Sequence, residues 1–216
     1  MTARILIVDD HPLFRGALRV AVGGDADPPH ISEAADFDAA RAAIEADSEL
    51  DLVLLDLNLP GASGFSGLMR LRALRPALPV IIVSGNAEPA TVGLAMQLGA
   101  SGFIPKTSSV ETMRLAMRTV LDGGVWAPPG LGAADGEAAV LAQKMARLTP
   151  QQLRVLTMLS EGLLNKQIAY ALDVAEATVK AHVSAILQKL EVGSRTQAVI
   201  AANRLMGLGL AGEPRS

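Results

Sequence analysis

The sequence contains no cysteine, few histidines and few aromatic residues, and each shortage excludes a class of site. Without cysteine, the 216-residue chain has no disulfide, no thiolate metal site and no thiol nucleophile. The three histidines, His11, His30 and His182, do not form a zinc-binding spacing. Aromatic residues make up 3% of the chain, which disfavours the base-stacking platforms that bind single strands or RNA. Any metal site is therefore expected to use oxygen ligands.

Long hydrophobic runs are also absent. No apolar stretch approaches the roughly 20 residues of a membrane-spanning helix, and the first ten residues run straight into a strand-like pattern without a cleavage site. The hydrophobic content of 50% is enough for a globular core. We therefore expect a cytoplasmic protein that has no contact with a membrane.

Charge is divided unevenly along the chain. The whole chain carries a net charge of −3, which by itself disfavours a nucleic acid as partner. Residues 1–121, however, hold 10 Lys and Arg against 14 Asp and Glu, a net charge of −4, whereas residues 148–216 hold 7 against 5, a net charge of +2. The small asymmetry favours the C-terminal part as the one that meets a nucleic acid.

The hydrophobic pattern of residues 1–121 predicts an α/β domain. Five short β-branched or Leu-rich runs alternate with helical patterns, which is typical of a doubly wound parallel sheet with helices on both faces. The expected strands are 4–8, 30–34, 52–55, 80–83 and 102–104, and the expected helices are 14–22, 37–46, 67–74, 90–98 and 110–121.

The rest of the chain predicts a linker and a small helical domain. Residues 122–147 are rich in Gly and Pro before a helix-capable segment, so we expect a partly helical linker. Thr149 is a suitable N-cap before Pro150. An all-α domain is predicted at 148–210, with a frayed tail at 211–216. Its four expected helices span about 150–161, 165–172, 176–190 and 195–206, and the second and third have a helix-turn-helix connection.

Charged and hydroxyl side chains stand after four of the five expected strands of the sheet. The residues after the first, third, fourth and fifth strands are, in turn, Asp9 with Asp10, Asp56, Ser84 and Lys106. Ligands of doubly wound sheets bind at this edge. Three carboxylates there repel one another unless a divalent cation, an ammonium group or a proton intervenes. Carboxylate ligands favour Mg²⁺, and a hydroxyl and an ammonium are donors to an anion, so the combination indicates a site for a phosphoryl group.

This set closely resembles the receiver domains of two-component response regulators, over residues 4 to about 121. The resemblance implies a (βα)5 sheet with the flavodoxin-like strand order 2-1-3-4-5. Asp56 would be the phosphoacceptor, attacking a phosphoryl donor as a carboxylate nucleophile. Asp10, Asp56 and the backbone carbonyl of Asn58 would bind Mg²⁺, and Asp9 would act through water.

The same resemblance assigns roles in the phosphorylated state. Lys106 would pair with the phosphoryl oxygens, Ser84 would hydrogen-bond one of them, and Phe103 would rotate inward as the switch aromatic when Ser84 moves. Taken singly, these residues also fit a surface lysine, a turn cap and a core side chain. An aspartyl-phosphate adds about −1.5 to −2 of charge and three acceptor oxygens, so it can bias a two-state element.

Residues 148–206 resemble a LuxR-type helix-turn-helix of the NarL/FixJ class, most specifically in "NKQIA…TVKAHV…ILQKL.V..RTQAV". Asn165 is expected to cap the first helix of the motif. A recognition helix offers its N-terminal side chains to base edges and its cations to phosphates. His182 also fits a purely structural role. The candidate DNA contacts are Lys180 first, then Thr178, Ala181, His182 and Ser184, with Lys166, Lys189 and Arg195 reaching the phosphate backbone.

Some positions depart from the pattern of this class. Ala175 stands where a capping Ser or Thr is common, which removes a side-chain cap normally worth about 1 kcal/mol. Ser184 stands where many relatives have a basic residue, which suggests weaker electrostatic binding, supplemented by a second subunit. The apolar stripe of the last helix fits either dimerisation or ordinary packing. The candidate dimerisation residues are Val199, Ala202, Leu205 and Met206.

The two resemblances together imply a transcription regulator and not an enzyme. A sensor histidine kinase would phosphorylate Asp56 with Mg²⁺, and the receiver would change its dimerisation or its contacts with the C-terminal domain, which binds a two-fold site on double-stranded DNA as an activated homodimer. Two alternatives stay open. An atypical receiver would bind DNA or a partner independently of phosphorylation. A Mg²⁺-dependent phosphohydrolase would need a second acid two residues after Asp56, where Asn58 stands.

Overall fold

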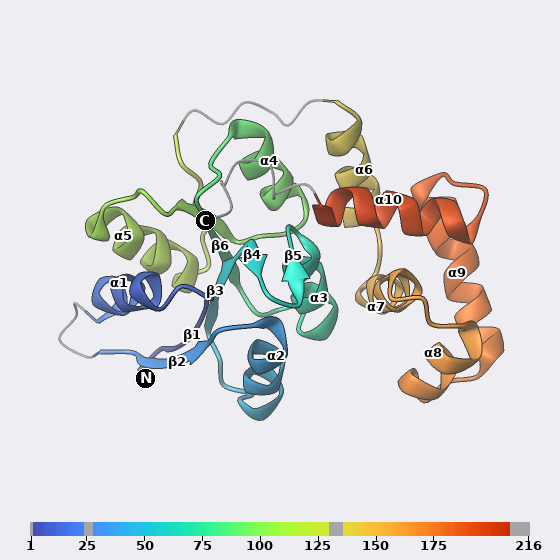
Figure 1. The fold of residues 1–216 in the computed structure, drawn as a ribbon, viewed down its shortest axis with the longest axis horizontal. Helices are drawn as coiled ribbons and strands as arrows, with labels where there is room; N and C mark the ends of the chain where they lie inside the picture. The colour runs from blue at the N-terminus through green and yellow to red at the C-terminus, as the bar shows by residue number, and fades with distance from the viewer. Residues whose placement is uncertain (1, 24–27, 130–135, 208–216) are drawn as a thin grey trace.

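The computed structural model describes residues 2–23, 28–129 and 136–207 of the chain (Figure 1). The predicted tail at 211–216 and the last three residues of the predicted C-terminal domain lie outside the described residues. Among the helices described, none is long and apolar enough to cross a bilayer.

Five parallel strands form the sheet of the N-terminal domain. Their spatial order is β2-β1-β3-β6-β7, which is the predicted order 2-1-3-4-5 when the parallel strands alone are numbered. The order reverses between β1 and β3, so the carboxyl ends of these two strands border the point where doubly wound sheets bind ligands. The strands are β1 (Arg4–Val8), β2 (His30–Ala34), β3 (Leu52–Asp56), β6 (Val80–Ser84) and β7 (Gly102–Pro105).

Helices cover both faces of this sheet, because alternate side chains of each strand point to opposite faces. Ile7 and Leu54 pack in the apolar cluster of α1 and α5, whereas Leu6 and Leu55 pack in the cluster of α2, α3 and α4. Figure 1 shows the two groups of helices on opposite sides of the strands. The helices are α1 (Pro12–Val22), α2 (Phe37–Ala46), α3 (Ser66–Leu74), α4 (Pro89–Gln97) and α5 (Val110–Leu121).

One element between β3 and α3 was not predicted. The hydrophobic pattern predicted no strand there, but β4 (Asn58–Leu59) and β5 (Ala62–Ser63) pair as a short antiparallel hairpin. Gly61 occupies its turn with φ +79°, a left-handed conformation that glycine adopts without strain. This β4–β5 hairpin begins two residues after Asp56.

The C-terminal part is all helical, which confirms the predicted fold class. Thr149 caps α7 as expected, because its Oγ accepts the Gln152 N–H at 3.2 Å and its own N–H donates to Gln152 Oε1 at 3.0 Å. The helices are α6 (Glu137–Ala146), α7 (Pro150–Ser160), α8 (Asn165–Leu172), α9 (Glu176–Leu190) and α10 (Arg195–Gly207).

The prediction that Asn165 caps the first helix of the motif is wrong. Asn165 is the first residue of α8, and Leu164 holds the N-cap position. The Leu164 N–H donates to Gln167 Oε1 at 2.7 Å, so only the reciprocal half of a capping box is present. The side chain of Asn165 instead accepts a hydrogen bond from Arg195 at 3.3 Å, which joins the starts of α8 and α10.

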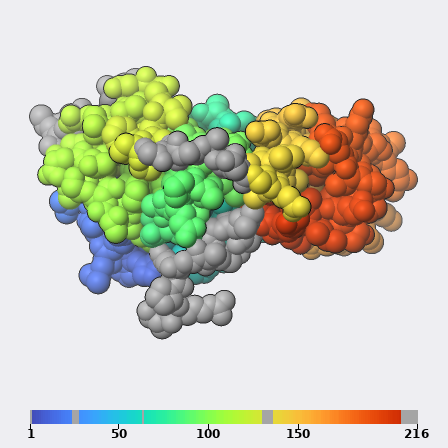
Figure 2. All heavy atoms as spheres, turned by 90° about the horizontal axis from the view of Figure 1, so that it is seen from above, coloured from blue at the N-terminus to red at the C-terminus, as the bar shows by residue number. Residues whose placement is uncertain are grey.

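The predicted linker is attached to both domains. Its first part continues the sheet, because the Phe103 N–H donates to Trp126 O at 3.0 Å and the Trp126 N–H donates to Ser101 O at 3.1 Å. Its helix, α6, packs against α4 of the N-terminal domain and against α9 and α10. Figure 2 shows the residues of α6 between the two larger parts of the molecule. The domain boundaries at 121 and 148 stay predictions.

The start of α9 lacks the side-chain cap, as the sequence suggested. Ala175 is its N-cap, has extended backbone (φ −67°, ψ 146°) and offers no acceptor to the first turn. We predict that Ala175→Ser stabilises the C-terminal helices by about 0.5–2 kcal/mol, because a serine Oγ can accept an N–H that the first turn leaves unpaired. Urea unfolding followed by circular dichroism measures this change. Ala177→Ser, at an exposed position inside the first turn, is the control, and an equal gain there would contradict the capping explanation.

Candidate functional site

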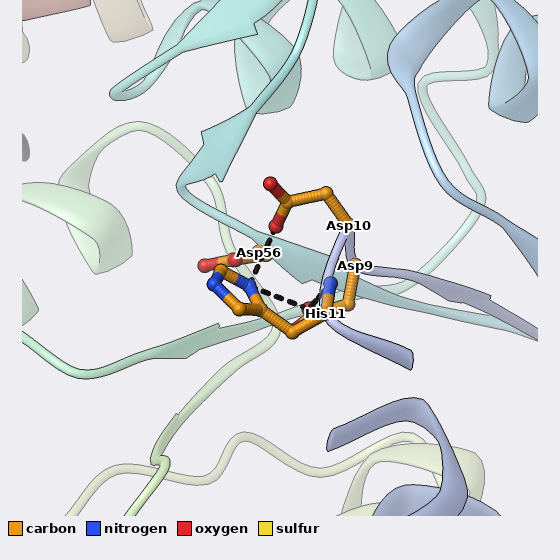
Figure 3. Close-up of side chains that lie close together, drawn as sticks. All are labelled: Asp9, Asp10, His11 and Asp56. Atoms are coloured by element: carbon orange, nitrogen blue, oxygen red, sulfur yellow. Dashed lines mark hydrogen bonds and ion pairs between the residues drawn. The ribbon is translucent and has the colours of Figure 1, made fainter. Parts of the chain in front are cut away.

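The predicted acidic residues converge at the carboxyl edge of the sheet. Asp9 and Asp10 follow β1, and Asp56 is the last residue of β3. Asp9 and Asp56 are buried, with 1% and 2% of their surface exposed, and Asp10 is half-buried. One ligand atom from each of these three residues and one ring nitrogen of His11 lie within 4.8 Å of one another (Figure 3).

Lys106 lies between two of these carboxylates. Its Nζ is 2.8 Å from Asp56 Oδ2 and 3.0 Å from Asp9 Oδ2, and the side chain is 15% exposed. The Lys106 N–H donates to Ser84 O at 2.8 Å, so the end of β6 holds the backbone that carries this ammonium group. Phe14 of α1 lies under Nζ, 4.9 Å from it to the ring centroid, which is a cation–π distance.

Burial and neighbouring charges shift the pKa values of Asp56 and Lys106 in opposite directions. Burial raises the pKa of the Asp56 carboxyl, and the Lys106 ammonium offsets part of the rise. Burial by itself would lower the pKa of Lys106, but the carboxylates of Asp56 and Asp9 outweigh it and the net shift is upward. The ammonium therefore stays charged at neutral pH. Three carboxylates and one ammonium leave the site with a formal charge of −2.

The residues fit a hard divalent cation. Asp56 Oδ1 is buried and has no hydrogen-bond partner in the described part of the chain, an arrangement that costs free energy unless something else pairs with it. A divalent cation would supply that partner and cancel the formal charge of −2. The resemblance to receiver domains implies Mg²⁺ at such an acidic pocket. That Asp10, Asp56 and the Asn58 carbonyl are the ligands, with Asp9 acting through water, remains a prediction.

Ser84 and Phe103 lie near this edge, at the end of β6 and within β7. Ser84 is buried and its Oγ accepts the Asn86 N–H at 3.2 Å. Phe103 is fully buried and stands opposite Ile82 in the register of β6 and β7, so it is a core side chain in this structure. Their roles as switch residues stay predictions.

Sequence reasoning missed three residues that contact the acidic group. His11 Nδ1 lies 2.6 Å from Asp10 Oδ1 and 3.3 Å from Asp9 Oδ1. Arg15 donates to Asp9 O at 2.6 Å and to Glu33 at 3.0 Å, and Phe14 contacts Lys106 as described above. His11 directly follows Asp10 in the sequence, and this adjacency was the available signal. Arg15 and Phe14 carry no signal beyond their position on the first helix.

The predicted recognition helix is α9, and its outer face is open. Thr178, Lys180, Ala181 and Ser184 are exposed in the whole chain, and His182 is half-buried. Figure 1 shows α8 and α9 on the side of the C-terminal helices that faces away from the sheet. The described part of the N-terminal domain therefore does not cover this face in the present arrangement. Lys180 Nζ pairs with Glu176 at 3.0 Å, one helical turn earlier, so a phosphate would compete with that carboxylate.

Two of the predicted phosphate contacts have internal roles. Lys189 Nζ donates to Arg147 O and to Gln152 Oε1, both at 2.8 Å. Arg195 donates to Asn165 and to Leu163 O. In this structure both side chains brace the helical domain, whereas Lys166 is exposed.

The predicted dimerisation residues are partly inside the molecule. Ala202 and Leu205 are fully buried, because α10 packs against α6, α7 and α9 and touches α3. Val199 and Met206 are half-buried in the same cluster. A dimer that used this stripe would therefore have to displace helices of its own chain.

Comparison with known proteins agrees with this geometry. Residues 5–118 match the family described as "Response regulator receiver domain", and residues 146–202 match "Bacterial regulatory proteins, luxR family". The glycerol metabolism activator of Pseudomonas putida is 43% identical over 208 residues, which cover 92% of this chain and 94% of that protein. The nitrate/nitrite response regulator protein NarL of Escherichia coli K12 is 30% identical over 203 residues, with coverage of 92% and 94%.

A solved structure of the Salmonella typhimurium RcsB response regulator has a TM-score of 0.55 at 19% identity, with coverage of 94% of this chain and 100% of that one, and supports the fold. The chain belongs to the two-component response regulators of the NarL/FixJ class. It combines a receiver with a LuxR-type DNA-binding domain.

We predict that Mg²⁺ stabilises the folded chain through this site. At a Mg²⁺ concentration about 100 times its dissociation constant, the gain is about 2.7 kcal/mol, measured as a rise in the midpoint of thermal unfolding. Asp10→Asn should remove most of the gain, whereas the exposed Asp122→Asn should keep it. The gain should shrink as pH falls, because protonation of Asp56, whose pKa burial raises, competes with the cation. An equal Mg²⁺ response in Asp10→Asn would place the ion elsewhere.

Proposed function

We propose that this chain is a DNA-binding transcription regulator switched by phosphorylation of Asp56. The observation that carries the proposal is the Asp56 carboxylate, whose Oδ1 is buried without a hydrogen-bond partner in the described part of the chain and whose Oδ2 pairs with the Lys106 ammonium, which also pairs with Asp9. A phosphoryl group on Asp56 would lie beside the Lys106 ammonium, which is 2.8 Å from Asp56 Oδ2. Its oxygens would accept a charge-assisted hydrogen bond from that ammonium. The glycerol metabolism activator, at 43% identity, is a regulator by name.

The phosphoryl donor is a sensor histidine kinase, the partner that a receiver domain implies. The Asp56 carboxylate attacks the phosphorus of a phosphohistidine, the P–N bond breaks, and the histidine nitrogen takes up a proton. Mg²⁺, held by Asp10, Asp56 and the Asn58 carbonyl, would supply charge neutralisation for the transferred oxygens. Lys106 orients the acceptor before transfer and binds the product after it, and Ser84 is placed at the same edge to add a hydroxyl.

The contacts between the receiver and the C-terminal helices support a change of domain packing as the output. Arg70 of α3 donates to Gly61 O at 3.0 Å and to Glu161 Oε1 at 2.9 Å, and its guanidinium lies 5.3 Å from the Phe37 ring centroid. Gly61 is the turn of the β4–β5 hairpin, and Glu161 follows α7. One side chain therefore joins the segment after Asp56 to the DNA-binding domain.

A partly open cleft also lies at the boundary between the domains, which leaves room for a change of domain packing. The cleft has a volume of about 200 Å³, with Met69 and Leu98 on the receiver side and Met145 and Leu153 on the other. A phosphorylation-linked shift of about 1–3 kcal/mol changes such an equilibrium by roughly 5- to 150-fold.

The DNA-binding half is proposed to act as a homodimer on a two-fold site. Lys180, Thr178, Ala181, His182 and Ser184 present the accessible face of α9, and two such helices about one DNA turn apart would bind half-sites. RcsB, a structural neighbour, is bound to DNA as dimers in one structure. Val199, Ala202, Leu205 and Met206 remain the proposed dimer residues, subject to release of α10 from its own chain.

Two other functions compete with this proposal. A receiver that acts independently of phosphorylation would not need the complete set of carboxylates, lysine and hydroxyl that is found here. A phosphohydrolase would need an acid at position 58, where the structure has Asn58 at the start of β4. We therefore propose a regulator without enzyme activity, and a cytoplasmic location follows from that role.

The test follows mass and DNA binding together. The full chain is incubated with Mg²⁺ and a small phosphoryl donor, then presented with a library of DNA sites. We predict that wild type gains one phosphoryl group and binds DNA more tightly, and that Asp56→Ala does neither. Lys180→Gln should gain the group but bind DNA more weakly, with the salt dependence reduced by about one counterion. An unchanged mass and unchanged affinity in wild type would refute the switch, and turnover of phosphate esters would favour the hydrolase.

The contact between Arg70 and Glu161 generates a separate prediction. This ion pair is partly exposed, at 28% and 42%, so we assign it about 0.2–1 kcal/mol, at most about fivefold in the balance between packed and separated domains. Glu161→Gln should increase the radius of gyration of the unphosphorylated chain in small-angle X-ray scattering. Glu137→Gln removes an exposed pair with Arg204 inside the C-terminal helices and is the matched control. A radius unchanged by Glu161→Gln would show that this pair does not hold the domains together.

A further inference from the structure

Three arginine side chains line one open cleft at the boundary between the domains. Arg41 of α2 and Arg70 of α3 come from the receiver, and Arg154 of α7 comes from the C-terminal helices. Figure 1 shows α3 and α7 side by side at this boundary. Arg41 and Arg154 are exposed, and their side chains make no hydrogen bond or ion pair with any residue that the structure describes. We call this surface, with its three arginines, the arginine cleft.

The arginine cleft holds more positive than negative charge. Among the described residues that line it, the carboxylates are Asp38 and Glu161. Glu161 is already used by Arg70, at 2.9 Å, and Asp38 is exposed. Because the guanidinium groups of Arg41 and Arg70 lie on one domain and that of Arg154 on the other, their like charges oppose close packing of the domains at this place. An anion between them would turn that repulsion into attraction.

Arg70 also has a donor that is not used. Two of its nitrogens donate to Gly61 O and Glu161 Oε1, which fixes the guanidinium at the boundary. Its Nε is buried and has no hydrogen-bond partner in the described part of the chain. An unpaired buried donor costs free energy. The three side chains together therefore offer many N–H donors, and what the arginine cleft lacks is an acceptor.

The size of the arginine cleft limits what can bind there. Its volume is about 230 Å³, below the roughly 300–1,000 Å³ of pockets that hold drug-sized ligands. A guanidinium group binds phosphate or carboxylate oxygens through two parallel N–H bonds, and several such groups at one place suit an anion with more than one charge. These features indicate a small phosphate and exclude a ligand as large as a dinucleotide.

We infer that the arginine cleft binds a small phosphate anion, of the class of inorganic phosphate and pyrophosphate, and that the bound anion holds the two domains together. A ligand that binds only the packed arrangement stabilises it by its own binding free energy. The site itself does not depend on Asp56. The effect on DNA binding rests on the proposed function, because domain packing is the equilibrium that phosphorylation is proposed to shift. The anion therefore opposes the effect of phosphorylation.

Titration calorimetry of the unphosphorylated full-length chain tests the site. The probes are inorganic phosphate and pyrophosphate, with acetate as a singly charged control at equal ionic strength and without Mg²⁺. We predict that one phosphate or pyrophosphate binds and that acetate does not. Arg41→Gln and Arg154→Gln should each weaken binding about 10-fold, because each removes a charge-assisted hydrogen bond. Arg204→Gln removes the same charge from α10 outside the cleft, where the side chain is 65% exposed, and should keep the affinity.

DNA binding tests the consequence for regulation. Inorganic phosphate at about 10 times its dissociation constant should weaken DNA binding by the chain phosphorylated at Asp56, by up to about 10-fold at constant ionic strength. Arg41→Gln should abolish this weakening. Arg41 lies on the receiver, so its loss would not relieve a direct competition between phosphate and DNA for α9. Weakening that persists in Arg41→Gln would therefore show such competition and overturn the regulatory effect.

The remaining outcomes separate this inference from the proposed function. No binding of either phosphate, equal binding of acetate, or phosphate affinity unchanged in both Arg41→Gln and Arg154→Gln would overturn the site. Loss of affinity in Arg41→Gln alone would place the anion on the receiver and overturn its role between the domains. A chain that binds phosphate as predicted but gains no phosphoryl group at Asp56 would refute the proposed switch and support the arginine cleft.

Discussion

The ammonium of Lys106 between Asp56 and Asp9 is the interaction on which the rest of the structure depends. Two carboxylates this deeply buried are tolerated because one cation lies 2.8 and 3.0 Å from them, and an unpaired buried charge would cost several kcal/mol. The parallel sheet brings both the buried carboxylates and the lysine that pairs with them to the same place. It ends three strands at one edge, where β1 and β3 bring the acids and the residue after β7 brings the lysine.

Lys106 neutralises only part of the negative charge at the carboxyl edge of the sheet, and the remaining charge is what allows a cation to bind there. One ammonium cannot balance three carboxylates, so the site retains a formal charge of −2, and Asp56 Oδ1 has no hydrogen-bond partner among the described residues. A divalent cation would balance that charge, whereas phosphoryl transfer would use a carboxylate oxygen of Asp56 as the nucleophile and add negative charge to the site. The segment that leaves Asp56 then runs directly into the β4–β5 hairpin, whose turn contacts Arg70. A change in charge at Asp56 is therefore one short hairpin away from the contact between the domains.

Local patterns predicted most of the fold and the central part of the site. Strand β3, LVLLD, is buried on both faces, and its sequence is a continuous apolar run up to Asp56. The register of the sheet brings Asp56, Ser84 and Lys106 to one edge, as their positions at the ends of the predicted strands implied. The contacts of His11 and Arg15 depend on the angle at which α1 leaves β1, which no periodicity encodes. Leu205 shows the same limit, because an apolar stripe looks identical whether it packs on its own chain or on a second subunit.

The arrangement of α9 and α10 indicates how DNA binding by the unphosphorylated chain could be limited. The outer face of α9 is exposed, so DNA binding in this structure is not limited by a domain that covers the recognition helix. The end of α10 is instead held by the receiver, because the Phe65 N–H donates to Met206 O at 3.1 Å, and Leu205 is buried beside it. A single DNA-binding domain gains much of its affinity when a second one binds the adjacent half-site. Holding α10 would therefore limit pairing of two chains while leaving each recognition helix accessible, and releasing it through Arg70 and the β4–β5 hairpin would couple Asp56 to dimer formation.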